Sequence, residues 1–224
     1  MPNYYSKSLN SNKLKECYAI APPRTKQFLE AEINYVLSEI NEKDTVLDLG
    51  CGYGRVAVRL AEKAEKVTGI DISPDNIEMA KEYSVKYKNC EFYTMNALNL
   101  SFPDQIFDMV VCVQNGISAF HVDPLKLIKE SIRVTRKGGI VLFSTYSDKF
   151  WNHRLEWFRK QADLGLIGEI DEDRTSEGII ICKDGFKAVT YSKQELLFLA
   201  SNFNLEATVY EIDNSCVFCK ILVN

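Results

Sequence analysis

The seven residues from Asp48 to Gly54, D-L-G-C-G-Y-G, constrain this chain most, because three glycines crowd one short turn. An apolar run over 45–49 precedes the turn and a helical pattern starts at Arg55, which predicts a strand, a tight turn and a helix. Glycine adopts positive φ easily, so the backbone can approach a ligand and leave N–H groups at the positive end of the helix dipole. We expect a site for a nucleotide-like cofactor here; the alternative is an ordinary strand-to-helix connection.

The spacing of these glycines distinguishes two cofactors. The dinucleotide fingerprint is G-x-G-x-x-G, and counting from Gly50 puts Arg55 at the third glycine, so that match is broken. Read as D-x-G-x-G-x-G from Asp48, the segment instead resembles motif I of the class I S-adenosylmethionine (SAM)-dependent methyltransferases.

Segments similar to the later methyltransferase motifs follow in order. A strand pattern over 66–70 ends at Asp71, about 20 residues beyond the first glycine, where nucleotide-binding folds carry a ribose-binding acid. A third strand, 90–94, precedes Asn96-Ala97-Leu98, which matches the adenine-contacting segment although the family commonly has Asp in place of Asn96. A fourth strand, 107–113, runs into a motif IV-like Gln114-Asn115-Gly116, and a fifth begins at Gly138-Gly139.

The resemblance implies a set of cofactor contacts. The glycines approach the methionyl part of SAM, Asp48 orients its ammonium, Asp71 accepts from the ribose hydroxyls, and the segment from Asn96 flanks the adenine. An Asn oxygen can accept from the adenine amine, without the charge of a carboxylate. The residues expected to bind the cofactor are Tyr18, Arg24, Asp48, Gly50, Cys51, Gly52, Gly54, Asp71, Ile72, Asn96, Ala97, Leu98, Gln114 and Asn115.

The N-terminal segment supplies further candidates. Arg24 follows two prolines, and its guanidinium offers two parallel donors that match the SAM carboxylate; the alternative is a solvated first-turn arginine. Tyr4, Tyr5 and Tyr18 are expected to form an aromatic lid with hydroxyls near the acceptor, with Tyr5 a candidate catalytic group; ordinary packing is the alternative. His121 follows the motif IV-like segment and is either a general base or a plain loop residue.

Composition excludes other classes. With 27 basic and 31 acidic side chains the net charge is −4, which argues against a nucleic acid partner. No stretch approaches the ~20 apolar residues that span a bilayer, and the polar N-terminus is unlike a signal peptide, so we expect no membrane association and a cytoplasmic location. Seven cysteines fit reduced thiols. Cys216 and Cys219 form a C-x-x-C, but strand positions three apart face opposite sides and no second Cys/His pair exists, so no metal site is expected.

The pattern along the chain predicts an α/β fold: a Rossmann-like, doubly wound, seven-stranded sheet, mostly parallel with an antiparallel C-terminal strand, plus a small cap. Strands alternate with helices, which implies right-handed crossovers, and a short turn at Asp213-Asn214 makes the last two strands antiparallel. The chain is long enough for one sizeable domain over 1–224. Within it we expect an N-terminal helical lid over 1–40 and a cap over 151–189 that covers the acceptor.

Together these features predict methyl transfer from SAM to an unidentified small-molecule acceptor by in-line displacement, leaving S-adenosylhomocysteine (SAH). Two alternatives stay open: a SAM-binding regulatory protein without turnover, and an NAD-dependent oxidoreductase. Oligomeric state and the methylated atom do not follow from the sequence.

Overall fold

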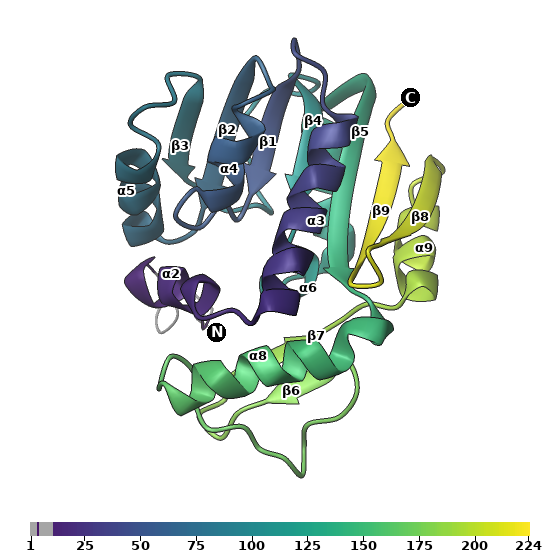
Figure 1. The fold of residues 1–224 in the computed structure, drawn as a ribbon. Helices are drawn as coiled ribbons and strands as arrows, with labels where there is room; N and C mark the ends of the chain where they lie inside the picture. Colours follow the sequence, from purple (N-terminus) through teal and green to yellow (C-terminus); the bar gives the residue numbers. More distant parts are fainter. Residues whose placement is uncertain (1–3, 5–10) are drawn as a thin grey trace.

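A seven-stranded sheet in the order β3-β2-β1-β4-β5-β9-β8 forms the centre of the molecule (Figure 1). The computed structural model describes residue 4 and residues 11–224. Pairs from β3 to β5 are parallel, whereas β9 runs antiparallel to both β5 and β8, as the short C-terminal turn predicts. The strands are β1 Thr45–Leu49, β2 Lys66–Asp71, β3 Cys90–Thr94, β4 Phe107–Cys112, β5 Thr135–Tyr146, β8 Glu206–Ile212 and β9 Cys216–Leu222.

Helices cover both faces of the sheet because successive strand residues point to opposite sides. Val46 joins the apolar cluster under one helix layer, and its neighbour Leu47 joins the cluster under the other. The first layer holds α3 Pro23–Glu39, α4 Arg55–Leu60 and α5 Pro74–Tyr83, and the second holds α6 Gly116–Ala119, α7 Pro124–Val134 and α9 Lys193–Ser201. This is the doubly wound arrangement expected from the sequence.

Side-chain capping explains where α5, α7 and α9 begin. The Ser73 and Asp123 side chains accept from backbone N–H groups of the first turns of α5 and α7, and Ser192 with Glu195 forms the capping box of α9. The fifth strand begins earlier than predicted. It was expected to begin at Gly138-Gly139, but α7 ends at Val134, β5 begins at Thr135, and the glycines lie in a bulge of β5. A Cβ at Gly139 would lie 2.6 Å from the Asp108 carbonyl oxygen, so only glycine fits that bulge.

A separate group of elements lies beyond the carboxyl ends of the central strands (Figure 1). It consists of η1 Asp148–Phe150, α8 Trp151–Asp163 and a two-stranded hairpin, β6 Ile179–Ile181 with β7 Lys187–Val189, and the N-terminal helix α2 Ser11–Ala19 lies near it. Arg154 of α8 is buried and donates to the carbonyls of Gly178 and Ala188, which ties the helix to the hairpin. These elements and the sheet edge enclose the site described next.

The C-x-x-C strand behaves as predicted. Cys216 packs into the apolar cluster on one face of the sheet and Cys219 into the cluster on the other. Among the described residues, no group of His, Cys, Asp or Glu is arranged to hold a metal ion. Within the same residues, no helix is both long and apolar enough to cross a bilayer.

Candidate cofactor and acceptor site

The glycine turn after β1 is fixed from below by β2. Its glycines all take positive φ, between 53° and 86°, which explains their residue type. The N–H groups of Gly50 and Cys51 donate to the Ile70 carbonyl at 2.8 and 2.9 Å, and that of Gly52 donates to the Asp71 carboxylate at 3.0 Å. The expectation that this turn leaves its N–H groups open to a ligand is therefore wrong for these three, and an anionic ligand group needs another donor.

The glycines also make room for side chains of other elements. A Cβ at Gly50 would lie 2.5 Å from the ring of Phe120, and one at Gly52 would lie 3.0 Å from Leu14 of α2. Gly54 packs against α5 instead, where a Cβ would meet Ala80 at 3.3 Å. The turn is thus a contact surface as well as a bend.

A cavity lies at the carboxyl ends of the central strands, where open α/β sheets bind their ligands. We call the part formed by residues that end or follow β1 to β4 the loop wall. We call the part formed by α2, α6, the end of β5, α8 and Phe186 the helix wall. Residues predicted to bind the cofactor that line the cavity are Tyr18, Asp48, Gly50, Cys51, Gly52, Asp71, Ile72, Asn96, Ala97, Leu98 and Gln114.

Asp48 is a buried acid on the loop wall, exposed by only 2%. Its Oδ2 has no hydrogen-bond partner within the described part of the chain. Burial raises the pKa of this carboxyl to about 7, and the nearby Arg55 guanidinium opposes that rise. A buried carboxylate without a donor is costly for the fold, so its presence in a cavity indicates a ligand cation.

Arg55, the first residue of α4, supplies the opposite charge. Its Nε and Nη2 are buried and no acceptor among the described residues reaches them, while the guanidinium lies 4.7 Å from the centre of the Tyr18 ring. Arg24, predicted for this role, lies outside the cavity. Its guanidinium donates to the side chain and the carbonyl of Asp213 at 2.5 and 2.6 Å, so the β8–β9 turn satisfies it.

Asp71, at the end of β2, both stabilises the neighbouring turns and faces the cavity. Besides the bond from Gly52, it accepts from the backbone N–H of Ser73 at 2.8 Å and from the side-chain amide of Asn76 at 3.2 Å. Each carboxylate oxygen has two lone pairs, so acceptor capacity remains toward the cavity. Next to it, the apolar side chain of Ile72 is 51% exposed at the cavity edge.

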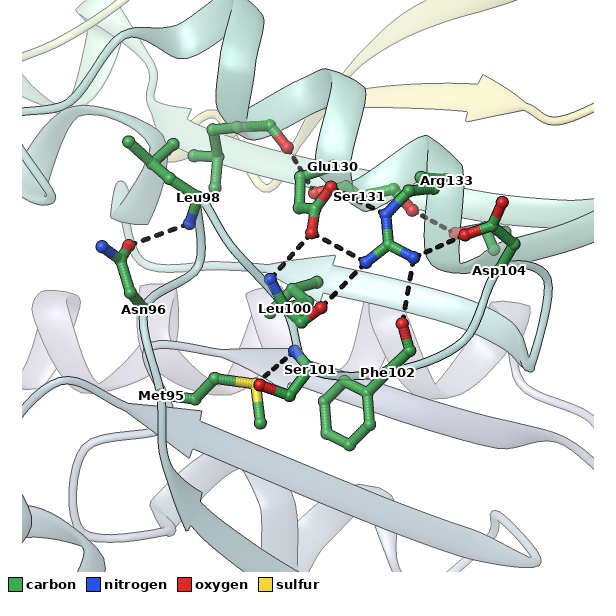
Figure 2. A network of polar contacts seen from close by, with 12 residues as sticks. Met95, Asn96, Leu98, Leu100, Ser101, Phe102, Asp104, Glu130, Ser131 and Arg133 are labelled. Atoms are coloured by element: carbon green, nitrogen blue, oxygen red, sulfur yellow. Dashed lines mark hydrogen bonds and ion pairs between the residues drawn. The ribbon is translucent and has the colours of Figure 1, made fainter.

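Two residues of α7 hold the loop after β3 (Figure 2). The Arg133 guanidinium donates to the carbonyls of Leu100 and Phe102 at 3.0 and 2.9 Å, and Glu130 accepts from the Leu100 N–H at 2.7 Å. Arg133 and Glu130 also pair with each other at 2.8 Å. We call this pair the α7 clamp; it fixes the end of the segment that begins at Asn96.

Asn96 makes a local contact as well as lining the cavity. Its Oδ1 accepts from the backbone N–H of Leu98 at 2.9 Å, which closes a local turn (Figure 2). An amide oxygen has two lone pairs, so this oxygen can still accept one further hydrogen bond, and the NH₂ group can donate.

The residues after β4 divide into one that faces the cavity and one that does not. Gln114 lines the cavity, and its N–H donates to Glu32, a buried acid of α3, at 2.9 Å. Asn115 lies outside the cavity and bridges two elements: it donates to the Val189 carbonyl and accepts from Thr145, both at 2.8 Å. The predicted ligand contact for Asn115 is replaced by a structural one.

The predicted catalytic residues are also placed differently. His121 is exposed and does not line the cavity; its ring faces β7, where burial and the charge of Lys187 lower its pKa. Tyr5 lies outside the described residues. Tyr4 donates to Asp184 at 2.5 Å and packs edge-on against Phe186. Of the expected aromatic lid, Tyr18 lines the cavity.

Comparison with known proteins gives this geometry a family. The family described as "Methyltransferase domain" matches residues 46–139. A 2-methyl-6-phytyl-1,4-hydroquinone methyltransferase of Synechocystis is 34% identical over 142 residues, 59% of this chain and 42% of that protein. A ubiquinone biosynthesis O-methyltransferase of Coxiella burnetii is 31% identical over 143 residues, 62% of this chain and 56% of that protein. A SAM-dependent methyltransferase from Methanosarcina mazei, known from its crystal structure, is 26% identical with a TM-score of 0.63, over 84% of this chain and 97% of that one.

The chain is similar to class I SAM-dependent methyltransferases, and the family match covers less than half of its length. The chain spans about half the length of the curated relatives that it matches. The family match ends at residue 139, so it includes the loop wall and none of α8 or the hairpin.

Most aromatic residues of the helix wall are not among the residues predicted from the sequence. The aromatic side chains of this wall are those of Tyr18, Phe120, Tyr146, Trp157, Phe158 and Phe186. Trp157 and Phe158 are buried and line the cavity as well. One signal was available: Arg154, Trp157, Phe158 and Gln161 recur at helical spacing and form the buried face of α8.

Proposed function

We propose that this protein transfers the methyl group of SAM to a small-molecule acceptor by in-line displacement. The observation that carries the proposal is a pair of opposite charges on the loop wall, Asp48 and Arg55, each with buried polar atoms that have no hydrogen-bond partner among the described residues. The amino-acid end of SAM carries an ammonium and a carboxylate, which this pair complements.

The other loop-wall residues suit the nucleoside end. Asp71 can accept from a ribose hydroxyl with the remaining lone pair of Oδ2, and the exposed side chain of Ile72 offers an apolar contact to the adenine. The Asn96 amide can accept from the adenine amine with its second lone pair or donate to a ring nitrogen of the base. The α7 clamp stabilises the loop that carries this contact.

Bound SAM supplies an electrophilic methyl group on a positively charged sulfur. The chain contributes position: holding acceptor and methyl in line converts a bimolecular step into an effectively intramolecular one, an effect of about 7–11 kcal/mol at best. The aromatic helix wall excludes water from the cavity, and this strengthens electrostatic interactions inside it.

We also propose roles for the elements outside the sheet. The segment 151–189 acts as a cap over the acceptor, because α8 contributes Trp157, Phe158 and Gln161 to the cavity. In the N-terminal 40 residues, α2 contributes Leu14, Cys17 and Tyr18 and acts as the lid, whereas α3 packs against the sheet. The seven unpaired cysteines support a cytoplasmic location.

Isothermal titration calorimetry with SAH and NADH tests the cofactor, and transfer of labelled methyl from SAM to a panel of small molecules tests turnover. We expect SAH to bind and NADH not to bind. Binding of NADH alone would favour the oxidoreductase alternative. Binding of SAH without transfer to any acceptor would favour a regulatory protein.

A further inference from the structure

The cap presents one polar side chain to the cavity that nothing in the protein satisfies. Gln161 of α8 is only 3% exposed and lines the helix wall. Within residues 4 and 11–224, its side-chain amide has no hydrogen-bond partner, although it follows Trp157 and Phe158 on the same buried face. The amide is free to hydrogen-bond a ligand group in the cavity that Gln161 lines.

The surroundings of Gln161 are flat and apolar. Aromatic rings from four separate parts of the chain line the same wall: Phe120 just after α6, Tyr146 at the end of β5, Trp157 of α8, and Phe186 before β7. Aromatic walls favour a planar apolar guest, which they contact face or edge. The wall therefore selects for shape rather than for a charged or flexible chain.

The described part of the cavity lacks a group that takes a proton at neutral pH near this wall. Its two carboxylates, Asp48 and Asp71, both belong to the loop wall, and no His or Lys of the described residues lines it. The titratable groups besides these are Arg55, two cysteines and three tyrosines; burial raises the pKa of Cys17 and of Tyr53 to about 12. Burial also raises the pKa of Cys51, and the remaining two tyrosines of the cavity are Tyr18 and Tyr146. His121 faces β7 instead.

We propose that the acceptor is a planar, largely apolar molecule with an acidic oxygen or sulfur, an aryl thiol or acidic phenol, which enters as its anion and is oriented by the Gln161 amide. This inference rests on the proposed methyl transfer. It is supported by three independent features: the unpartnered amide, the aromatic wall, and the confinement of carboxylates to the loop wall.

The chemical step balances without a base. The acceptor loses its proton to solvent before it enters. Its anionic oxygen or sulfur then donates an electron pair to the methyl carbon, the bond between methyl and sulfonium sulfur breaks, and its electron pair remains on sulfur as the thioether of SAH. Positive and negative charge are both neutralised, which a dry cavity favours over two separated charges. The Gln161 N–H group donates to the ionised atom and lowers its pKa.

Four acceptors test the class: 4-nitrobenzenethiol, 4-nitrophenol, unsubstituted phenol and benzylamine, each with SAM and the whole chain. We expect one or both of the nitro compounds to be methylated at least about tenfold faster than phenol and benzylamine, and the thiol–phenol pair identifies sulfur or oxygen as the preferred atom. The proposal is overturned if SAH binds but benzylamine reacts as fast as the nitro compounds, or if neither nitro compound reacts above the enzyme-free rate. Failure of SAH to bind rejects the proposed function instead.

Substitution of Gln161 tests the anchor separately from the class. With the preferred acceptor, Gln161→Leu is expected to lower kcat/KM roughly ten- to hundredfold, the range for a lost hydrogen bond to a charged group. It is also expected to shift the pH profile of kcat to higher pH, because the bound acceptor anion loses a donor. Gln161→Glu adds a like charge and should have a larger effect. Gln194→Leu, on the exposed face of α9, is the matched control. An unchanged profile with normal SAH affinity in Gln161→Leu removes Gln161 from recognition.

Discussion

The two walls of the cavity are built in opposite ways. Predicted residues of the loop wall fall within a contiguous stretch, 48–114, in which each short segment follows a strand of the sheet. The helix wall combines α2, α6, the end of β5, α8 and a residue of the hairpin, which are spread from 14 to 186. A motif can describe the first wall because its geometry is local. The second exists only after folding, so its chemistry has to be read from the structure.

The largest expected effect concerns the acid of the loop wall. Asp48→Asn should weaken SAH binding by roughly 100-fold or more, because a charge that pairs with the ligand ammonium is removed in a buried place. The same change should raise the melting temperature at pH 8 by about 2–4 °C, the shift for a gain of ~1 kcal/mol in a domain of this size. Calorimetry and thermal unfolding measure the two. Loss of affinity together with loss of stability would show that Asp48 supports the fold rather than the ligand.

Arg55 and Arg24 form a matched pair for the next prediction. Arg55→Leu should weaken SAH binding roughly ten- to hundredfold, as expected for lost hydrogen bonds to a charged group. Arg24→Leu should leave SAH affinity unchanged, because its guanidinium is paired with Asp213 outside the cavity. Calorimetric titration of both variants with SAH shows which arginine binds the ligand. The reverse result would return Arg24 to the carboxylate role predicted from the sequence.

The pH dependence of cofactor binding follows from Asp48. Its pKa of about 7 means that the carboxyl is protonated at lower pH and cannot pair with an ammonium, so SAH affinity should fall about tenfold from pH 8 to pH 6. Stability has the opposite sign for this group: because its pKa is raised by folding, its contribution is largest at pH below about 4 and is lost as pH rises through 7. Titration of SAH at several pH values tests the first statement. A flat profile in the parent chain would exclude Asp48 as the ammonium partner.

A smaller effect is expected from the α7 clamp. Arg133→Leu removes the donors to Leu100 and Phe102 and should weaken SAH binding about fivefold by loosening the loop after β3. Arg133→Lys keeps the charge but loses the fork of donors, so an intermediate effect is expected. Arg59→Leu, which breaks a surface ion pair with Glu30 on the other helix layer, is the control. Equal effects of Arg133→Leu and Arg59→Leu would mean that the clamp serves stability alone.

The smallest expected effect belongs to His121. His121→Ala should change kcat/KM by less than about twofold, whereas loss of a general base typically costs 10²–10⁴-fold. The measurement is the rate with the preferred aryl acceptor across pH. A large drop in kcat/KM would identify His121 as the general base and contradict the proposal that the reaction needs no base.

The sequence allowed the sheet and most of the loop wall to be predicted, because strand ends, caps and glycine turns are set by neighbouring residues. Two errors near this wall have one cause. Arg24 and Asn115 carry suitable side chains, but Asp213 and Val189, distant in sequence, satisfy them first. Arg55 was predicted only as the start of a helix and as the residue that breaks the dinucleotide fingerprint, because the burial of its guanidinium atoms depends on the fold. Gln161 carries no motif at all, and its importance depends on which face of α8 the fold buries.

Strand β9, which lies between β5 and β8, has a practical consequence for experiments. Because Cys216 and Cys219 lie under different helix layers, each thiol becomes reactive only when its own layer opens. Pulsed labelling with a thiol reagent, resolved by peptide mass spectrometry, can therefore time the detachment of either layer in the native chain without introducing a probe.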